Sequence, residues 1–311
     1  MKNSAAPGGR TEIKMTHAER MNSNTLAEEY LDSWVLRYRY IDNVEPNMDY
    51  EFLGMKFSTP ILAGGFGMHK RFHESGHMGL ARAVEEAGSL NFNGWMDDEQ
   101  VEEIAAAGIR TIRGVKPFAD HDRIYQCIDH DTKAGAVGIC MDIDHIFEPN
   151  GKYSKGPMGQ FGRQTVEDLK GYVRYSKIPF ILKGVLTRED AEKCLEIGPA
   201  AIIVTNHNNR FPDMVPPLAA LPEVKEAVNG AFPVLVDGCL ESGVEAFKAF
   251  ALGADGVCVC RPLMNAFHTG GPEAVTKKLN DITAELAGCM ANTGADCVAH
   301  ISRDSLMKKT W

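Results

Sequence analysis

Three polar residues with complementary chemistry stand at the ends of two apolar segments. Lys183 closes the segment of residues 179–184, where a buried charge is costly unless a bound anion or an electron-rich ring offsets it. His207 and Arg210 lie three residues apart just after the segment of residues 200–206. A histidine can take up a proton near neutral pH, and the planar guanidinium of arginine can hold a carboxylate with two hydrogen bonds. The pair suits a hydroxy acid or a keto acid, although a single histidine at such a position is more often structural.

A second group of residues, closer to the C-terminus, is typical of a phosphate site. Asp237-Gly238 ends one apolar segment, and Cys260-Arg261-Pro262 ends the next. Loops that lead from a strand into a helix often bind phosphate, because the free backbone N–H groups of the helix point at the anion. These residues favour a phosphorylated cofactor or substrate.

Three histidines suggest a metal site as an alternative. His69, His73 and His77 recur every four residues and would line one face of a continuous helix, as metal ligands do. Gly76 interrupts the run, however, and the segment fits better as a loop that leads into a helix. We therefore predict no metal ion.

The cysteines also lack metal-site spacing. There are eight of them, most lie in apolar runs, and none forms a CxxC pair, so they are interpreted as reduced core thiols. Cys258 and Cys260 would point to the same face of a strand, which leaves a redox or metal pair open.

The elements that must position these residues follow a regular alternation. Helical apolar periodicity fills the stretches between the apolar segments, and several of these stretches end in glycine, as helix C-termini do. Eight strands are predicted, at residues 61–65, 89–93, 109–113, 136–142, 179–184, 200–206, 232–238 and 254–260. Strands alternating with helices predict a parallel sheet, and eight such units fit one (β/α)8 TIM barrel better than two open-sheet domains.

The predicted barrel divides the chain into two regions and predicts where its functional site lies. We expect a disordered, frayed N-terminal tail over residues 1–20 and a single barrel over residues 21–311. In such barrels the chemistry gathers where the strands end and the following loops begin. The polar residues named above all stand at predicted strand ends.

The composition of the 311-residue chain is that of an ordinary globular protein. Hydrophobic residues make up 44% and charged residues 24%, close to average usage. No apolar run approaches the ~20 residues that span a bilayer, and the first twenty residues lack a secretory signal, so we predict a cytoplasmic protein. The net charge of −9 provides no basic stripe for nucleic acid, which makes a small-molecule partner the better expectation.

Several strings in this sequence resemble a known family. ILKGVLTREDA, TNHNNRFPD, VDGCLESGVEAFKAFALGADGV and CRP are similar to those of the FMN-dependent enzymes that oxidise 2-hydroxy acids, the group of glycolate oxidase, lactate oxidase and mandelate dehydrogenase. The resemblance spans roughly residues 35–305. It implies a barrel that uses FMN to oxidise a 2-hydroxy acid, and a homo-oligomer, since related barrels are often tetramers.

The resemblance also implies a role for individual residues. His207 would be the base, Lys183 would stabilise the charge of the reduced flavin, and Arg210 would hold the substrate carboxylate. Trp95 would line the substrate pocket, and Lys116 falls near a pocket position that is often tyrosine, where it could act as a replacement cation. The cofactor would contact Gly65, Phe66, Gly67, Asn93, Cys140, Lys183, Asp237, Gly238 and Arg261.

The departures from the family pattern are informative. Asn208-Asn209 stand where the family has two glycines, which predicts a pocket of different shape. Glu241 stands where an arginine usually meets the phosphate and should weaken cofactor binding, and Cys260 replaces a glycine of the same cradle. The segment that starts at Asp142-Ile143-Asp144-His145 offers no match for a second substrate arginine. These losses favour a substrate larger than glycolate or lactate, or differently charged.

Two alternatives therefore stay open. The same FMN barrel could catalyse an isomerisation, because a fold does not fix a reaction. The barrel could also have lost its flavin and bind a ligand without redox chemistry, which Glu241 and Cys260 would favour. Lys183, His207 and Arg210 together favour oxidation.

Overall fold

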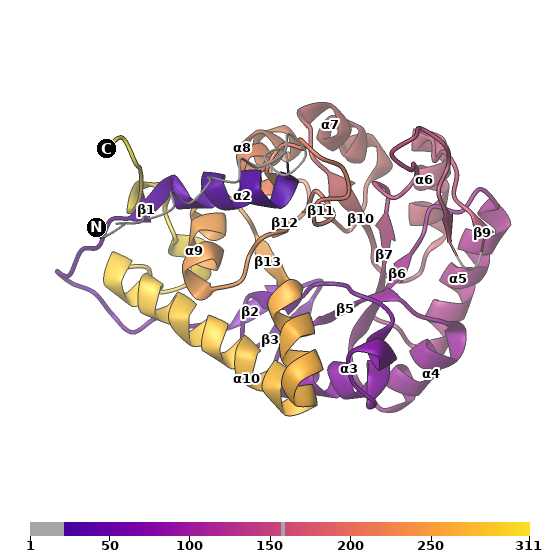
Figure 1. Cartoon of the computed structure of the whole chain (residues 1–311), viewed down its shortest axis with the longest axis horizontal. Helices are drawn as coiled ribbons and strands as arrows, with labels where there is room; N and C mark the ends of the chain where they lie inside the picture. The colour runs from indigo at the N-terminus through magenta and orange to yellow at the C-terminus, as the bar shows by residue number, and fades with distance from the viewer. Residues whose placement is uncertain (1–21, 157–158) are drawn as a thin grey trace, which may run out of the picture.

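The computed structural model of the protein describes residues 22–156 and 159–311, and its centre is a closed barrel of parallel strands (Figure 1). The hydrogen-bonded order around the barrel is β10-β11-β12-β13-β4-β5-β6-β7, and β7 closes onto β10. The strands are β4 (Ile61–Ala63), β5 (Asn91–Trp95), β6 (Thr111–Val115), β7 (Gly138–Asp142), β10 (Phe180–Val185), β11 (Ala201–Val204), β12 (Val234–Asp237) and β13 (Gly256–Val259). Each overlaps one of the eight predicted segments, so the predicted (β/α)8 barrel is confirmed.

Three strands run farther than predicted, and β10 does so by a single residue, Val185. β5 and β6 each continue two residues past the expected end, because Trp95 pairs with Gly114 and Val115 pairs with Met141. Glycines in both extensions let the backbones approach closely: a Cβ on Gly94 would stand 2.7 Å from the carbonyl carbon of Phe66. The extension carries Trp95 up to the rim where the strands end.

Helices follow the strands and cover the outside of the barrel (Figure 1). They are α3 (Gly76–Glu86), α4 (Asp98–Ala106), α5 (His121–Ala134), α6 (Val166–Tyr175), α7 (Arg188–Ile197), α8 (Pro217–Val228), α9 (Gly243–Ala251) and α10 (Arg261–Thr293). Side chains of Asp97, Thr165, Thr187 and Ser242 cap helix N-termini, and left-handed glycines end α5, α7 and α10. α10 bends at Gly271, next to Pro272, where the backbone leaves helical geometry.

Both faces of the barrel strands are buried, which explains their nearly continuous apolar sequence. One set of side chains fills the interior and the alternate set packs under the helices. The interior set includes Leu62, Phe92, Ile112, Cys140, Ile181, Ile203, Leu235 and Cys258. A filled interior leaves only the rim free for a ligand.

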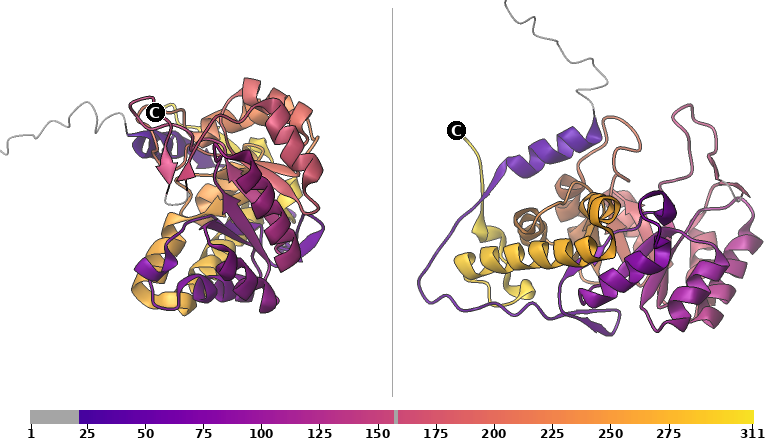
Figure 2. Two further views of the ribbon diagram at one scale, coloured as in Figure 1. Left: turned by 90° about the vertical axis from the view of Figure 1, so that its right-hand side faces the viewer. Right: turned by 60° about the horizontal axis from the view of Figure 1, so that its bottom comes forward.

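Two small additions occupy opposite sides of the barrel (Figure 2). The hairpin of β2 (Tyr50–Phe52) and β3 (Met55–Phe57) adds Phe52 and Phe57 to the interior cluster. α2 (Ser23–Asp32) lies on the side where the loops after β7 and β11 rise, and β1 (Trp34–Leu36) then pairs with β14 (Leu306–Lys308).

Three predictions about the chain as a whole have different outcomes. The expected disordered tail of residues 1–20 lies outside the described residues, so that boundary remains a prediction. Among the described residues, no helix is both long and apolar enough to cross a bilayer. All eight cysteines are free, and six of them are buried, as expected for reduced core thiols.

Candidate active site

A cavity of about 580 Å³ opens at the carboxyl ends of the barrel strands. This is a usual size for a site that holds a small molecule or a cofactor. The predicted residues that line it are Gly65, Phe66, Gly67, Asn93, Trp95, Lys116, Cys140, Lys183, His207, Asp237, Gly238 and Arg261. Arg210 is the one predicted site residue that is not part of the lining.

Lys183 brings a buried positive charge to the floor of the cavity. Its Nζ lies 3.1 Å from Oδ1 of Asp142 and 4.0 Å from Asp237. Burial alone would lower the pKa of Lys183, but Asp142, Asp144 and Asp237 outweigh it and raise that pKa well above its usual value. The ammonium therefore stays charged, and it can stabilise negative charge on a ligand above it.

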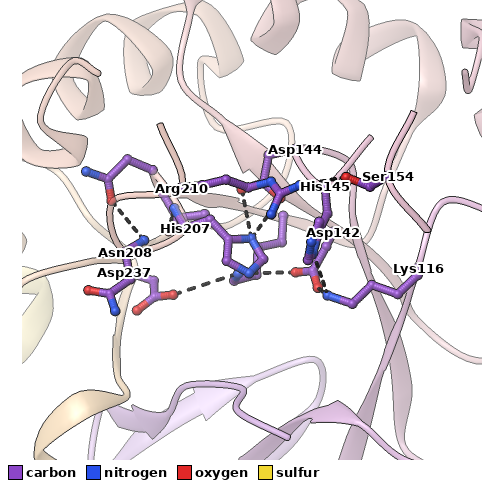
Figure 3. A network of polar contacts seen from close by, with 12 residues as sticks. Lys116, Asp142, Asp144, His145, Ser154, His207, Asn208, Arg210 and Asp237 are labelled. Atoms are coloured by element: carbon purple, nitrogen blue, oxygen red, sulfur yellow. Dashed lines mark hydrogen bonds and ion pairs between the residues drawn. The ribbon is translucent and has the colours of Figure 1, made fainter. Parts of the chain in front are cut away.

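Asp142 is shared by two ammonium groups. Besides Lys183, it is contacted by Lys116, which comes from the end of β6 (Figure 3). Burial opposes ionisation of Asp142, but the two lysines prevail and hold the pKa of this carboxyl well below its usual range. Lys116 also lies 3.1 Å from Nδ1 of His145, so its position is fixed from two sides.

His207 is paired with a different carboxylate. Its Nδ1 lies 3.0 and 3.1 Å from the two carboxylate oxygens of Asp144 (Figure 3). A carboxylate only accepts hydrogen bonds, so Nδ1 carries the proton and the lone pair is on Nε2. Gly184 makes room for this pair, since a Cβ there would stand 2.6 Å from that of Asp144. The histidine thus has the tautomer that a proton acceptor needs.

The loop that carries His207 has an unusual backbone. His207, Asn208 and Asn209 all have positive φ, of 50°, 55° and 66°. Asparagine tolerates this left-handed region better than most residues, which explains how it can replace the glycines expected there. Asn208 lines the cavity, whereas the side chain of Asn209 accepts a hydrogen bond from the backbone of Ser23. Only one of the two extra side chains changes the shape of the pocket.

Arg210 points toward the loop after β7. Its Nη2 donates to the carbonyl of Phe147 at 2.7 Å and to the hydroxyl of Ser154 at 2.8 Å. Its Nε is buried and has no partner among the described residues. The guanidinium therefore links the loop after β11, which carries Arg210, to the loop after β7.

One wall of the cavity combines bare backbone with an unpaired amide. Gly65 and Gly67 expose their backbone there, and Asn93 stands beside them. The side chain of Asn93 donates to Thr111 at 2.7 Å, but its Oδ1 is buried without a partner in the described part of the chain. Because such an acceptor is costly to leave unpaired, it indicates that a bound group supplies a donor.

The opposite end of the cavity has the features of a phosphate cradle. Gly238 and Cys239 have positive φ, which turns the backbone after β12, and α10 begins at Arg261. The Nη2 of Arg261 lies 3.1 Å from the Sγ of Cys239 and 3.5 Å from a carboxylate oxygen of Glu241. Glu241 and Cys239 therefore already engage the guanidinium of Arg261.

The three histidines of the alternative metal site do not share a helix face. His69 lies in the short 3-10 helix η1 (His69–Arg71), His73 in the following loop, and His77 in α3. His69 is buried against Phe66, and the Nε2 of His77 lies 2.7 Å from Glu103. The run is divided among three local structures, so it does not line one face of a helix as the spacing alone would suggest.

Three residues of the site received no role from the sequence, namely Asp142, Asp144 and His145. All three belong to the string that follows β7, which was noted only for lacking a substrate arginine. The sequence signal that could have identified them is the presence of two carboxylates and a histidine at the end of a barrel strand. The conformation of the loop decides which carboxylate contacts the lysines and which contacts His207. The spacing in the sequence does not predict this pairing.

The fold and the cavity together define a class, an α/β barrel protein with a site for a small molecule or a cofactor at the carboxyl ends of its strands. The comparisons agree with that class. The model of a family described as FMN-dependent dehydrogenase matches residues 10–157 and 153–308. The chain therefore belongs to this family, whose members use FMN to oxidise 2-hydroxy acids, and the predicted family and cofactor are confirmed.

Individual relatives fit the same assignment. Glycolate oxidase 3 of Oryza sativa subsp. indica is 30% identical over 304 residues, with 86% of this chain and 83% of that protein covered. Glycolate oxidase of Spinacia oleracea is also 30% identical, with 86% and 82% covered. The crystal structure of mandelate oxidase superposes with a TM-score of 0.84 at 26% identity and covers 93% of this chain and 90% of that one.

Proposed function

We propose that this protein oxidises a 2-hydroxy acid to the keto acid, with His207 as the base. The observation that carries the proposal is the His207–Asp144 pair, which stands on the rim of a cavity whose floor holds the charged Lys183. The carboxylate keeps the proton on Nδ1 and stabilises the imidazolium that forms when Nε2 accepts a proton. Asp144 thus orients the base and leaves its Nε2 free to accept a proton.

FMN fits the residues that line the cavity. Lys183, Asn93, Cys140 and the backbone of residues 65–67 would hold the ring. Asp237, Gly238 and Arg261 would hold the ribityl phosphate end. When bound, FMN supplies a two-electron acceptor for the α-hydrogen of the substrate. The ammonium of Lys183 supplies the fixed positive charge that favours the extra electrons.

The substrate would lie between His207, Trp95 and Lys116. Trp95 packs edge-on against Phe118, with 6.2 Å between ring centroids, and forms an apolar wall. Arg210 would hold the carboxylate, and support for this comes from its unpaired Nε and from its place beside His207. Because Arg210 also binds Phe147 and Ser154, holding the substrate would be coupled to the position of that loop.

The isomerase and the flavin-free alternatives are separated from this proposal by one experiment. The purified protein is denatured and any released flavin is identified. The intact protein is then mixed without oxygen with a panel of 2-hydroxy acids while the visible spectrum is recorded. We expect a yellow protein that releases FMN and is bleached by at least one acid. Bound FMN that no acid bleaches would contradict the oxidation, and a protein that stays colourless after FMN is added would favour the flavin-free barrel.

Location and assembly complete the proposal. We place the protein in the cytoplasm, whereas two of the Arabidopsis thaliana relatives carry the word peroxisomal in their names. We also propose a homo-oligomer, with the tetramer as the expected form. Light scattering on the purified protein tests the assembly, because it gives the mass independently of shape.

A further inference from the structure

Two histidines stand side by side at the rim of the cavity. The ring centroids of His145 and His207 lie 5.1 Å apart with the planes inclined by 72°, and both rings line the cavity (Figure 3). Each ring is held through its Nδ1. The partner of His207 is a carboxylate, that of Asp144, whereas the partner of His145 is the ammonium of Lys116.

The two partners impose opposite tautomers. An ammonium has only donors, so Nδ1 of His145 must accept, and the single N–H of this neutral ring is on Nε2. In His207 the proton is on Nδ1 and the lone pair is on Nε2. The remaining ring nitrogen, Nε2, is therefore an acceptor in His207 and a donor in His145.

The surroundings keep His145 neutral. Burial is the largest cause, and the charges of Lys116 and Arg210 and the neighbouring His207 add to it, against a smaller opposing effect of Asp142. Together they lower the pKa of His145 to about 3. At neutral pH this ring can donate a hydrogen bond but does not take up a proton.

Lys116 is itself held in place, so its contact with His145 is maintained. It contacts Asp142, and the other oxygen of Asp142 is held by Lys183 at 3.1 Å. Ligand atoms of Asp142, His145 and His207 lie within 4.8 Å of one another, as they would around a metal ion. The ammonium of Lys116 contacts two of these three residues and brings a positive charge to the cluster.

We propose that His145 binds the substrate carboxylate through its Nε2–H, and that Lys116 is the positioning residue that sets this tautomer. The inference rests on the proposed function, because it places the carboxylate beside the base His207. It supplies a second group to hold the carboxylate, because the arginine of the loop after β7, Arg163, is exposed and does not line the cavity. The donor is neutral, so it adds a directed hydrogen bond without adding charge.

The first test reads the tautomer directly. The holoenzyme is labelled with ¹⁵N-histidine and its NMR spectrum is recorded from pH 5.5 to 8.5, with His145→Gln used to assign the signals. We expect His145 to be neutral with the hydrogen on Nε2 across this range. A protonated ring, or a hydrogen on Nδ1, would overturn the proposal.

The role of Lys116 is tested in the same spectra. Lys116→Met removes the donor to Nδ1, so the hydrogen of the neutral ring should no longer be confined to Nε2 and the signals of both tautomers should appear. If Lys116→Met folds and His145 still gives the wild-type signals, Lys116 does not set the tautomer. The measurement on the wild-type protein decides the donor assignment even if this variant does not fold.

The second test measures binding of a carboxylate that cannot be oxidised in this way. Oxalate is titrated into the holoenzyme and the shift of the flavin absorbance is followed. His145→Phe keeps a ring without the N–H and should weaken oxalate binding about tenfold or more, as loss of a hydrogen bond to a charged group does. His145→Gln keeps a donor and should stay within about threefold of the wild type. His300→Gln changes an exposed histidine, which pairs with Asp296, and is the matched control.

The outcomes separate this proposal from the proposed function. If His145→Phe binds oxalate as the wild type does, or if the glutamine and phenylalanine variants lose affinity equally, His145 is not the donor. If no 2-hydroxy acid bleaches the wild-type flavin, the proposed oxidation fails, and the spectra and the oxalate affinities still decide the donor on their own.

Discussion

The two ends of the cavity hold their charges in different ways. At the end formed by β6, β7 and β10, Asp142 lies between two lysines, and the exposed fractions of the three side chains are 10 to 12%. At the end formed by β12 and β13, Arg261 lies 3.5 Å from Glu241, and their side chains are 25% and 51% exposed. The first network is buried and multiply connected, and the second is a single pair open to water.

This difference matches what each end has to do. Chemistry on the substrate needs fixed protonation states, and buried pairs of opposite charge provide them because neither partner can leave without large cost. A phosphate cradle needs a cation that is free to receive its ligand, and Glu241 limits that freedom at Arg261. Under the proposed function, the chain would combine a rigid reaction centre with a cofactor that is held less tightly at its phosphate.

The largest expected effect is on the base. His207→Ala should lower kcat by about 10³-fold while FMN stays bound, because the proton acceptor is lost and the ring site is intact. Anaerobic stopped-flow reduction and the flavin spectrum measure both quantities. His300→Ala, which changes an exposed histidine, serves as control. Wild-type rates in His207→Ala would show that another group accepts the proton.

The buried network should come next. Asp142→Asn leaves two ammonium groups without their carboxylate and should destabilise the holoenzyme by about 3–5 kcal/mol in urea unfolding at pH 7. The pKa of Asp142 is well below its usual range, so its contribution is complete above about pH 4 and is lost as the pH falls further. The difference between wild type and variant should therefore shrink in acid. A difference that does not change with pH would contradict the ion-pair account.

A smaller effect is expected where the substrate is held. Arg210→Lys loses the planar two-pronged contact and should raise the KM about tenfold with kcat nearly unchanged. Steady-state kinetics with the best acid of the panel measure this change. Arg163→Lys, an exposed arginine of the neighbouring loop that does not line the cavity, is the control. A variant with normal KM would remove Arg210 from the substrate site.

The smallest effect belongs to the phosphate end. Glu241→Gln releases Arg261 from an exposed ion pair and should tighten FMN binding about two- to fivefold, with stability changed by less than about 1 kcal/mol. Glu241→Arg should tighten it further by adding a cation. Quenching of FMN fluorescence during titration gives both affinities. Unchanged affinity in both variants would show that the carboxylate does not compete with the phosphate, and the contrast between the two ends would disappear.

Much of the site was predictable because it lies at strand ends. Lys183 ends an apolar run, and His207 follows the next one, so their meeting at one rim follows from a parallel barrel alone. The family resemblance added the roles and the cofactor. The strand ends were less predictable, since the extension of β5 to Trp95 depends on pairing with Gly114 across the sheet.

The sequence by itself determined the barrel, the cavity at its rim and the residue types available there, because hydrophobic periodicity and strand order fix which segments converge. Only the tertiary structure decided which partner each of these residues has. Asp144 rather than Asp142 pairs with His207, and Lys116 contacts both Asp142 and His145. The physical reason is that protonation and tautomer depend on contacts of 3 Å between residues far apart in the chain, and loop geometry sets these contacts.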